Sequence, residues 1–336
     1  MKVVIFMPNY IGDLLMTTPA IRFLKNCVNS FKTYVVVKPY LLELLESNPY
    51  IDNFIFKLSK LQLLRDVIKI KPDYVILFRT TFFNSLVSKL SSVKYSIGTN
   101  EDCSSLFLTE TIKKDLSLPY RTECAFLVEK FLSFVNINCK ITSDELKKLD
   151  FFGYDKEEIK DSVEQKLQKF NIDTNKKIII ISPYSTRITK MLTVEQIVEI
   201  VIRLNKIYAK DIEIVFVGAK ESIFFVNQII SNLGIEFCKS LCGELSLREL
   251  GYLLSISSYL ISVDCGVAFV AQAVGTKTTI VFTSTLPERY GPYNENVKII
   301  YRPTLCSPCY KDKCKRKDYK CIKQVDLDEI INSVSL

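Results

Sequence analysis

The sequence predicts an α/β protein built from two doubly wound parallel sheets, each in a domain of its own. Short apolar runs alternate with amphipathic segments along the whole chain, which is the rhythm of strands and helices in a parallel sheet. A length of 336 residues is too great for one ordinary domain of this class and suits two of roughly 150 residues each.

The apolar runs place the strands and the domain junction. A helix expected over 122–135 is followed by the polar stretch 142–150 and by an amphipathic segment over 155–170. We therefore place the first domain at 1–150 and the second at 151–336. Thr193, followed three residues later by Gln196, predicts a capping box at a helix start. The expected strands are 3–7, 33–38, 53–56 and 74–78 in the first domain, and 178–181, 212–217, 259–263 and 278–282 in the second.

Composition excludes several classes of protein. Apolar runs are far shorter than the roughly 20 residues that a membrane-spanning helix needs, and the N-terminus reads as a strand rather than a secretory signal. We expect a cytoplasmic protein with at most peripheral membrane contact. The net charge of +8 suits an anionic membrane surface or a phosphorylated substrate, and nothing supports nucleic acid as a partner. Since the chain has no His, a general base must be a carboxylate, or else Lys, Tyr or Cys.

The cysteines fall into two groups. In a reducing compartment they do not predict a disulfide framework, so six scattered ones are interpreted as small buried hydrophobic residues. The other four have the spacing C-x2-C-x4-C-x6-C and predict a structural tetrathiolate site for Zn or Fe, with redox-labile thiols as the alternative. The scattered group is Cys27, Cys103, Cys124, Cys139, Cys238 and Cys242, and the clustered group is Cys306, Cys309, Cys314 and Cys321.

Ligands of open α/β sheets bind at the carboxyl ends of strands, so the loops after the strands are the candidate sites. The first such loop contains Gly12 and Asp13 at a strand-to-helix turn. Asp13 is either the N-cap of the following helix or a general base facing the cleft. Gly12 allows a ligand to approach the backbone closely.

Two loops of the second domain suit a phosphate. Between 182 and 190, hydroxyls and basic groups are gathered on Ser185, Thr186, Arg187 and Lys190, although a solvated polar loop would look the same. The other loop, 264–266, ends a strand and begins a small-residue helix, whose N-terminal amides make an anion site. Asp264 as a plain helix cap is the alternative there. The absence of a GxGxxG sequence disfavours a Rossmann dehydrogenase.

Taken in this order, the loops resemble those of glycosyltransferase family 9, which contains the ADP-heptose:lipopolysaccharide heptosyltransferases, and the resemblance covers about 1–325. The family opens with a strand, a Gly-Asp turn and a helix of small residues with Pro, as 12–20 does here. Its donor-phosphate loop ends in Lys, as 185–190 does, and its Asp-Ser/Thr-Gly segment resembles 264–266. The loop 283–293 and the Cys cluster also resemble segments of family members.

This resemblance implies a GT-B fold, in which two Rossmann-like domains face a central cleft. It implies inverting transfer of a heptose or related sugar from an ADP-sugar, without a catalytic metal, to a lipopolysaccharide-core acceptor. Asp13 is then the general base, and Lys190 binds the diphosphate. A lipid-linked acceptor implies peripheral association with the inner leaflet of the cytoplasmic membrane. Donor contacts are implied or suggested for Gly12, Ser185, Thr186, Glu221, Asp264, Cys265 and Gly266.

Some positions depart from the family or leave alternatives open. Leu192 stands where an aromatic residue, usually Trp, follows the lysine, and Phe269 stands where His usually follows the Asp-Ser/Thr-Gly segment. Because of these departures, two alternatives to the function above remain. The chain could be a related transferase that uses another nucleotide sugar or a protein acceptor, or a non-catalytic sugar-nucleotide-binding protein. The presence of Asp13 and Lys190 speaks against the second alternative. Arg79 and Arg121 are candidate acceptor contacts or simple surface charges.

Overall fold

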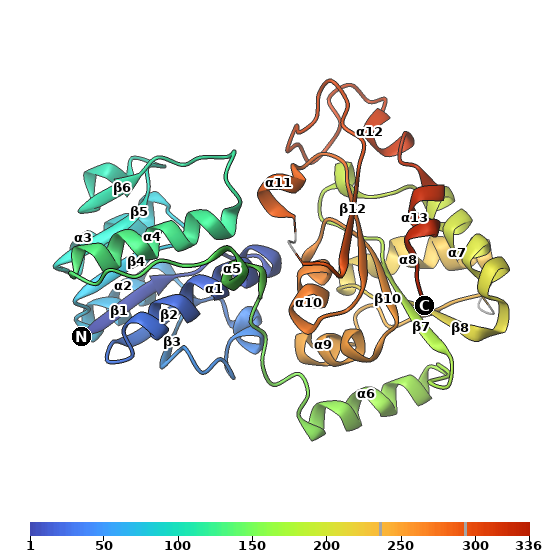
Figure 1. The fold of residues 1–336 in the computed structure, drawn as a ribbon, viewed down its shortest axis with the longest axis horizontal. Coiled ribbons are helices and arrows are strands. Elements are labelled where there is room, and N and C mark those ends of the chain that lie inside the picture. The colour runs from blue at the N-terminus through green and yellow to red at the C-terminus, as the bar shows by residue number, and fades with distance from the viewer. Residues whose placement is uncertain (235–236, 292–293) are drawn as a thin grey trace. The chain divides into compact units, whose positions relative to one another are not determined.

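The computed structural model describes residues 1–234, 237–291 and 294–336. The chain divides into two compact units, Met1–Phe152 and Gly153–Leu336. Each unit holds one six-stranded sheet in which every pair of neighbouring strands is parallel (Figure 1). The predicted α/β class with two parallel sheets is confirmed.

The sheet of the first unit has the order β3-β2-β1-β4-β5-β6. Its strands are β1 (Lys2–Phe6), β2 (Lys32–Val37), β3 (Asn53–Phe56), β4 (Tyr74–Leu77), β5 (Tyr95–Thr99) and β6 (Glu110–Ile112). Its helices are α1 (Ile11–Cys27), α2 (Lys60–Ile70), α3 (Phe82–Leu90), α4 (Tyr120–Phe134) and α5 (Ser143–Lys147).

Helices cover both faces of this sheet. On one face, Val4, Phe6 and Val36 of the strands pack with Leu63 of α2 and Val87 of α3. On the other face, an aromatic cluster joins the strands to α4, with the ring of Phe131 at 5.2 Å from that of Tyr74 and 6.3 Å from that of Tyr95. A sheet buried on both faces explains why its strands read as continuous apolar runs rather than as alternating patterns.

Helix α1 contains a proline, and the neighbouring hydroxyl of Thr18 compensates for the missing donor. Pro19 has no backbone N–H, so it cannot donate to the carbonyl of Leu15. The hydroxyl of Thr18 donates to that oxygen instead, at 2.8 Å. The same hydroxyl accepts a hydrogen bond from the backbone N–H of Asp150 at 2.8 Å, and the Asp150 carboxylate pairs with Arg22 of α1. The helix is thus tied to the end of its own unit.

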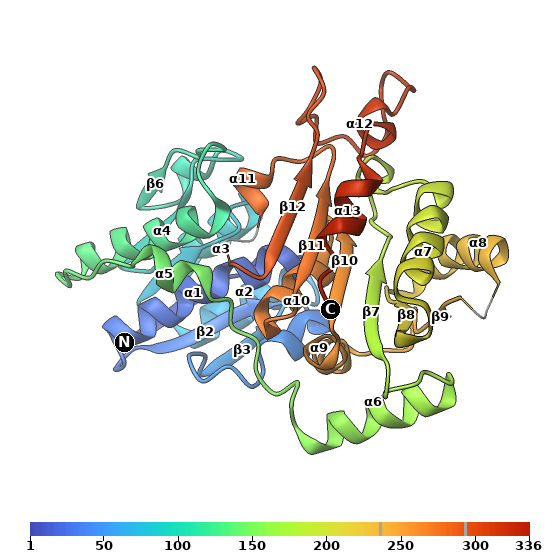
Figure 2. The ribbon, with the colours of Figure 1, turned by 45° about the vertical axis from the view of Figure 1, so that its right-hand side comes forward.

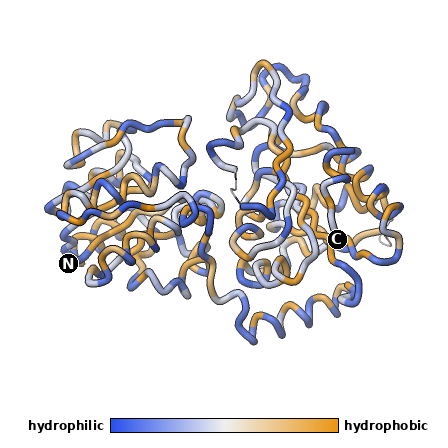
Figure 3. Tube along the Cα trace, in the orientation of Figure 1, coloured by the Kyte–Doolittle hydropathy of each residue, from blue (hydrophilic) through white to orange (hydrophobic). Residues whose placement is uncertain are grey.

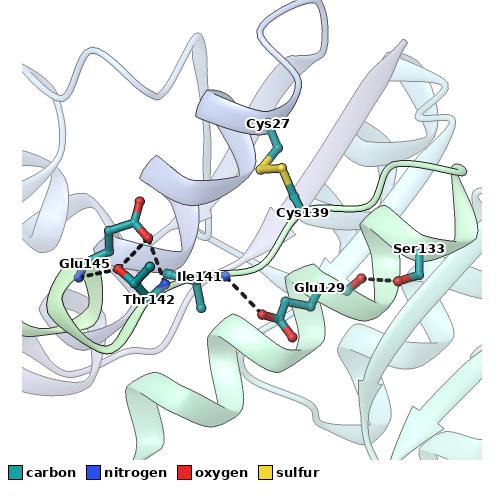
Figure 4. The surroundings of a disulfide bond; sticks show 7 residues. All are labelled: Cys27, Glu129, Ser133, Cys139, Ile141, Thr142 and Glu145. Atoms are coloured by element: carbon teal, nitrogen blue, oxygen red, sulfur yellow. Dashed lines mark hydrogen bonds between the residues drawn. A yellow bond between two sulfur atoms is a disulfide. The ribbon is translucent and has the colours of Figure 1, made fainter.

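Cys27 and Cys139 form a disulfide, so the interpretation of these two as separate free thiols is wrong (Figure 4). Cys27 ends α1, and Cys139 lies in the segment after α4, 112 residues further along the chain. That segment is also held to α4, because Glu129 accepts hydrogen bonds from the backbone N–H of Ile141 at 3.1 Å and from Lys140 Nζ at 3.0 Å. Such a long separation gives no local signal, which is why the sequence did not reveal the pair.

We expect the double variant Cys27→Ser/Cys139→Ser to lower the free energy of unfolding by about 2–4 kcal/mol, because the bond closes a long loop in the unfolded chain. Chemical denaturation of the oxidised protein measures this loss. The variant Cys103→Ser, which removes an exposed free thiol, is the control and should leave stability unchanged. Thiol titration of the denatured, unreduced protein should find nine free thiols, and a count of eleven would contradict the bond.

The sheet of the second unit has the order β12-β11-β10-β7-β8-β9. Its strands are β7 (Lys177–Ser182), β8 (Ile212–Phe216), β9 (Lys239–Ser240), β10 (Tyr259–Val263), β11 (Thr278–Phe282) and β12 (Val297–Tyr301). Its helices are α6 (Glu157–Lys169), α7 (Val194–Tyr208), α8 (Ile223–Leu233), α9 (Leu247–Ile256), α10 (Gly266–Val274), α11 (Pro287–Tyr290), α12 (Lys320–Lys323) and α13 (Leu327–Ser333).

The larger core of this unit lies between the sheet and the helices α7, α8 and α13 (Figure 2). Apolar residues gather along the strands of both sheets (Figure 3). The predicted capping box at the start of α7 is confirmed, since the Thr193 hydroxyl accepts from Gln196 N and the Gln196 side chain accepts from Thr193 N. Within the described residues, no helix is both long and apolar enough to cross a membrane.

Candidate active site

Asp13 is the third residue of α1, at the carboxyl edge of the first sheet. The N-cap of this helix is Tyr10, whose side chain makes no capping hydrogen bond, so the interpretation of Asp13 as an N-cap is wrong. A carboxylate in the first turn is favoured by the helix dipole. Its side chain stays partly exposed, whereas the neighbouring Gly12 is buried. Asp13 is therefore partly accessible to solvent at this edge.

Tyr120, the first residue of α4, lies beside Asp13. Its hydroxyl donates to the carbonyl of Phe78, just after β4, at 2.8 Å. Burial, followed by the charges of Cys124 and Asp13, raises the pKa of Tyr120 well above its usual value. Tyr120 therefore stays a neutral hydrogen-bond donor, and it links the surroundings of Asp13 to the end of β4.

Two further features of the first unit are a buried arginine and a hollow. Arg121 is 2% exposed and donates to the carbonyl of Leu146 at 3.0 Å, so it is a buried structural residue rather than a surface contact. After β6, a hollow of about 360 Å³ is lined by basic, acidic and apolar side chains, among them Lys113, Glu123 and Phe126.

In the second unit, Lys190 and Asp264 form an ion pair at the carboxyl edge of the sheet. Lys190 ends the 3-10 turn Ile188–Lys190 after β7, and Asp264 directly follows β10. The Lys190 Nζ and Asp264 Oδ2 atoms are 2.6 Å apart, and Asp264 is only 5% exposed. The hydroxyl of Thr285, after β11, donates to the same carboxylate oxygen at 2.6 Å. Asp264 thus fixes the position of the ammonium group.

The start of α10 lies next to this pair. Cys265 is its N-cap and makes no capping bond through its side chain, and Gly266 is its first residue. The Cys265 thiol is 3.4 Å from the hydroxyls of both Ser182 and Ser262. With Asp264 outside the helix and bound to Lys190 and Thr285, its interpretation as a plain helix cap is wrong. The first-turn amides of α10 are oriented as an anion site requires.

The remaining predicted donor residues lie at this edge in different environments. Ser185 is buried and Thr186 exposed. Glu221 is exposed and lies in the 3-10 turn Lys220–Ser222 that follows β8, on the far side of β7 from β10. Phe269 is buried in α10, 4% exposed, so it packs in the interior.

The loop after β7 is tied to the Cys-rich segment. Arg187 Nε lies 3.2 Å from Asp312 Oδ1, and the Thr189 hydroxyl donates to the carbonyl of Lys311. In turn, Thr283 donates to the carbonyl of Thr189 at 2.6 Å. The loop 283–293, which includes Arg289 and Tyr290, is described only as far as Gly291, because Pro292 and Tyr293 lie outside the described residues.

The four clustered cysteines share one neighbourhood but do not form a closed site. Burial, and then the nearby thiols of Cys309, Cys306 and Cys314, raise the pKa of Cys321. The Cys306 thiol contacts the Thr304 hydroxyl at 3.3 Å, and the Cys314 thiol contacts Asp318 at 3.7 Å. Across the described part of the chain, no three metal-ligating side chains lie close enough together to hold an ion, so the predicted tetrathiolate geometry is not present.

Sequence reasoning gave no individual role to Thr285, Ser182 or Thr189, although Ser182 and Thr189 belong to the hydroxyl-rich loop 182–190 that it suggested for a phosphate. The sequence feature that could have pointed to these three residues is their position, because each ends or follows a strand at the carboxyl edge where Lys190 and Asp264 lie. Hydroxyl residues at such positions are common in loops, so position alone did not separate them from solvated side chains.

Comparison with solved structures shows the same fold in glycosyltransferases. The structure of Escherichia coli ADP-heptose LPS heptosyltransferase II is similar, with a TM-score of 0.79 and 15% identity, covering 99% of this chain and 97% of that one. The dodecameric iron-containing heptosyltransferase TibC, solved with ADP-D-β-D-heptose, is similar with a TM-score of 0.60 and 11% identity, covering 99% of this chain and 75% of TibC.

Sequence comparison identifies the family. Lipooligosaccharide heptosyltransferase 2 of Campylobacter jejuni subsp. jejuni serotype O:6 (strain 81116 / NCTC 11828) is 24% identical over 110 residues, which is 32% of this chain and 34% of that protein. The match thus spans about a third of the relative's length. The sequence model described as glycosyltransferase family 9 (heptosyltransferase) matches residues 61–320. The chain therefore belongs to glycosyltransferase family 9, the family described as heptosyltransferase.

Proposed function

We propose that this enzyme transfers a heptose, or a related sugar, from an ADP-sugar to a lipopolysaccharide-core acceptor. The observation that carries the proposal is the Lys190–Asp264 pair beside the start of α10, a fixed cation next to helix amides at the carboxyl edge of the second sheet. Such a site suits the diphosphate of a nucleotide sugar. TibC was solved with ADP-D-β-D-heptose, which supports an adenine nucleotide as the donor.

In the proposed reaction, the Asp13 carboxylate accepts the proton of an acceptor hydroxyl. The hydroxyl oxygen forms a bond to the anomeric carbon on the face opposite the diphosphate, and the bond from that carbon to the diphosphate oxygen breaks, which inverts the configuration. ADP leaves with the electron pair, and Lys190 and the α10 amides stabilise its growing charge. The first domain expected from the sequence, 1–150, would bind the acceptor, and the second, 151–336, would bind the donor.

Isothermal titration of ADP, UDP and GDP, and of their sugars, into the purified protein tests the donor. We expect selective binding of the adenine nucleotides. Preference for UDP or GDP would overturn the donor assignment and favour the alternative of another nucleotide sugar, for which the buried Phe269 in place of His is the supporting observation. Adenine-nucleotide binding without ADP release in the presence of lipopolysaccharide-core acceptors would favour a non-catalytic binding protein.

We further propose that the four clustered thiols bind a structural Zn or Fe ion after small movements of their side chains. Their shared neighbourhood supports this, as does the iron in TibC. Elemental analysis of the purified protein should find about one equivalent of metal, lost in the double variant Cys309→Ser/Cys314→Ser. Metal-free wild-type protein that is folded and active would contradict the site.

We also propose that the lipid-linked acceptor holds the enzyme at the inner leaflet of the cytoplasmic membrane. The net charge of +8 supports contact with anionic headgroups. Flotation with acidic vesicles, compared with neutral ones, tests this association.

A further inference from the structure

Three basic side chains follow three strands of the first sheet at its carboxyl edge. Lys38 directly follows β2, Lys57 directly follows β3, and Arg79 lies two residues beyond β4. Backbone hydrogen bonds continue the sheet past the strand ends, since Lys57 N donates to Val37 O at 2.9 Å and Arg79 N donates to Phe6 O at 3.2 Å. The three residues therefore lie in one row across the edge.

This row continues the apolar face that packs on α2 and α3. Phe6, Val36, Ile55 and Leu77 are paired across the sheet and are buried in that core. Side chains alternate along a strand, so the residue two places further on points to the same face. The three cations stand two residues beyond Val36, Ile55 and Leu77. Apolar side chains at these positions would extend the core by one more row.

Among the described residues, no carboxylate compensates the positive charges of the row. All three side chains are half-buried, and none forms an ion pair with a carboxylate in the part of the chain that the structure describes. Burial, and then the charges of Arg79 and Lys38, lower the pKa of Lys57 to about 8. A bound anion would supply the missing charge.

The row is connected to the loop that leads to Asp13. The Lys38 ammonium lies 5.6 Å from the centre of the Tyr40 ring, and the Tyr40 hydroxyl donates to the carbonyl of Asn9. Asn9 and Tyr10 lead directly into α1, whose third residue is Asp13. Tyr10 and Tyr40 are 64% and 55% exposed as residues, so both can pack on a sugar.

We propose that Lys38, Lys57 and Arg79 bind an anionic group, a phosphate or a carboxylate, carried by the sugar acceptor. This inference rests on the proposed function and adds that the acceptor is charged near its reacting hydroxyl. The guanidinium of Arg79 offers two parallel donors to such a group, and the two ammonium groups offer point charges.

Competitive acetylation of lysines, read by mass spectrometry at pH 8, tests the site directly. Inorganic phosphate or glucuronate is added while sodium chloride keeps the ionic strength constant. We expect one of the two anions to slow the labelling of Lys57 severalfold while Lys32, exposed at the opposite end of β2, is unaffected. Protection by phosphate alone identifies a phosphate group, and protection by glucuronate alone identifies a carboxylate. Unchanged labelling, or equal slowing of both lysines, would overturn the proposal.

Transfer kinetics test the link to the acceptor. We expect Lys57→Met and Arg79→Gln each to raise the acceptor KM roughly 10- to 100-fold, the loss typical of a charge-assisted contact, with donor KM and kcat unchanged. Lys32→Gln removes the same charge from the opposite edge and should change none of these values.

The two proposals fail differently. Transfer that proceeds with an unchanged acceptor KM in Lys57→Met would overturn the anion subsite and leave the transferase intact. Protection of Lys57 without transfer to any acceptor would overturn the transferase and leave an anion site.

The pH dependence of stability tests whether Lys57→Met folds and whether the charge cluster exists. Below pH 8 the ammonium of Lys57 is held among like charges in the folded chain, so Met should raise the melting temperature at pH 7. The folded chain releases its proton near pH 8 and the unfolded chain near 10.5, so wild-type stability rises with pH between these values. The advantage of Met should therefore shrink over that window, and a pH-independent difference would contradict the cluster.

Discussion

Replacing Asp13 with Asn is expected to lower kcat by about 10²- to 10⁴-fold, the usual contribution of a general base. Asn has nearly the same shape but cannot accept the proton of the acceptor hydroxyl at neutral pH. Because Asp13 lies in the first unit and the Lys190 site in the second, ADP affinity should stay unchanged. Steady-state ADP release and titration of ADP measure the two quantities.

The matched control is Asp66→Asn, which makes the same change of charge on α2 of the same unit. It should retain wild-type kcat. If Asp13→Asn also kept kcat within about twofold of the wild-type value, Asp13 would not be the base, and the role would have to pass to another group near the acceptor hydroxyl.

Replacing Lys190 with Met is expected to weaken ADP binding and to lower kcat by about 10²- to 10³-fold, the range found when a donor to a developing anion is removed. The variant should also be less stable, because it leaves the Asp264 carboxylate buried without its ammonium partner. Titration of ADP and thermal denaturation measure both losses.

Two further variants separate binding from stability. In Lys190→Met/Asp264→Asn the unpaired charge is gone, so we expect stability to recover while ADP affinity does not. Lys166→Met is the matched control, since Lys166 forms a comparable pair with Glu249 at 2.6 Å between α6 and α9 of the same unit. It should lose stability and keep ADP affinity. Equal loss of ADP affinity in both lysine variants would show that Lys190 acts only through folding.

Most of the fold could be predicted because the central strands of each sheet are buried on both faces and therefore appear as apolar runs. The strands that were not predicted lie toward the sheet edges. β6 and β9 have three and two residues, too few for a pattern. β5, with the sequence YSIGT, is buried although it is polar and contains Gly98, where a side chain would collide with the Thr80 hydroxyl.

The places of the candidate site residues at strand ends could be predicted, but the partners of these residues could not. Asp13, Lys190 and Asp264 follow strands, and the rule that ligands bind at strand ends points to all three. The contact between Lys190 and Asp264 joins residues 74 positions apart, and it depends on β7 and β10 being neighbours in the sheet. The row of Lys38, Lys57 and Arg79 depends in the same way on strand order. Periodicity and spacing carry no information about strand order.

The like charges of that row also decide how the enzyme can be improved. Because Lys57 is held among other cations, many apolar replacements there should make the folded chain more resistant to heat. Directed evolution selected on thermostability alone would therefore tend to discard Lys57 early, together with any recognition that depends on it. A library screened for robust variants of this enzyme should keep Lys38, Lys57 and Arg79 fixed and seek its gains elsewhere.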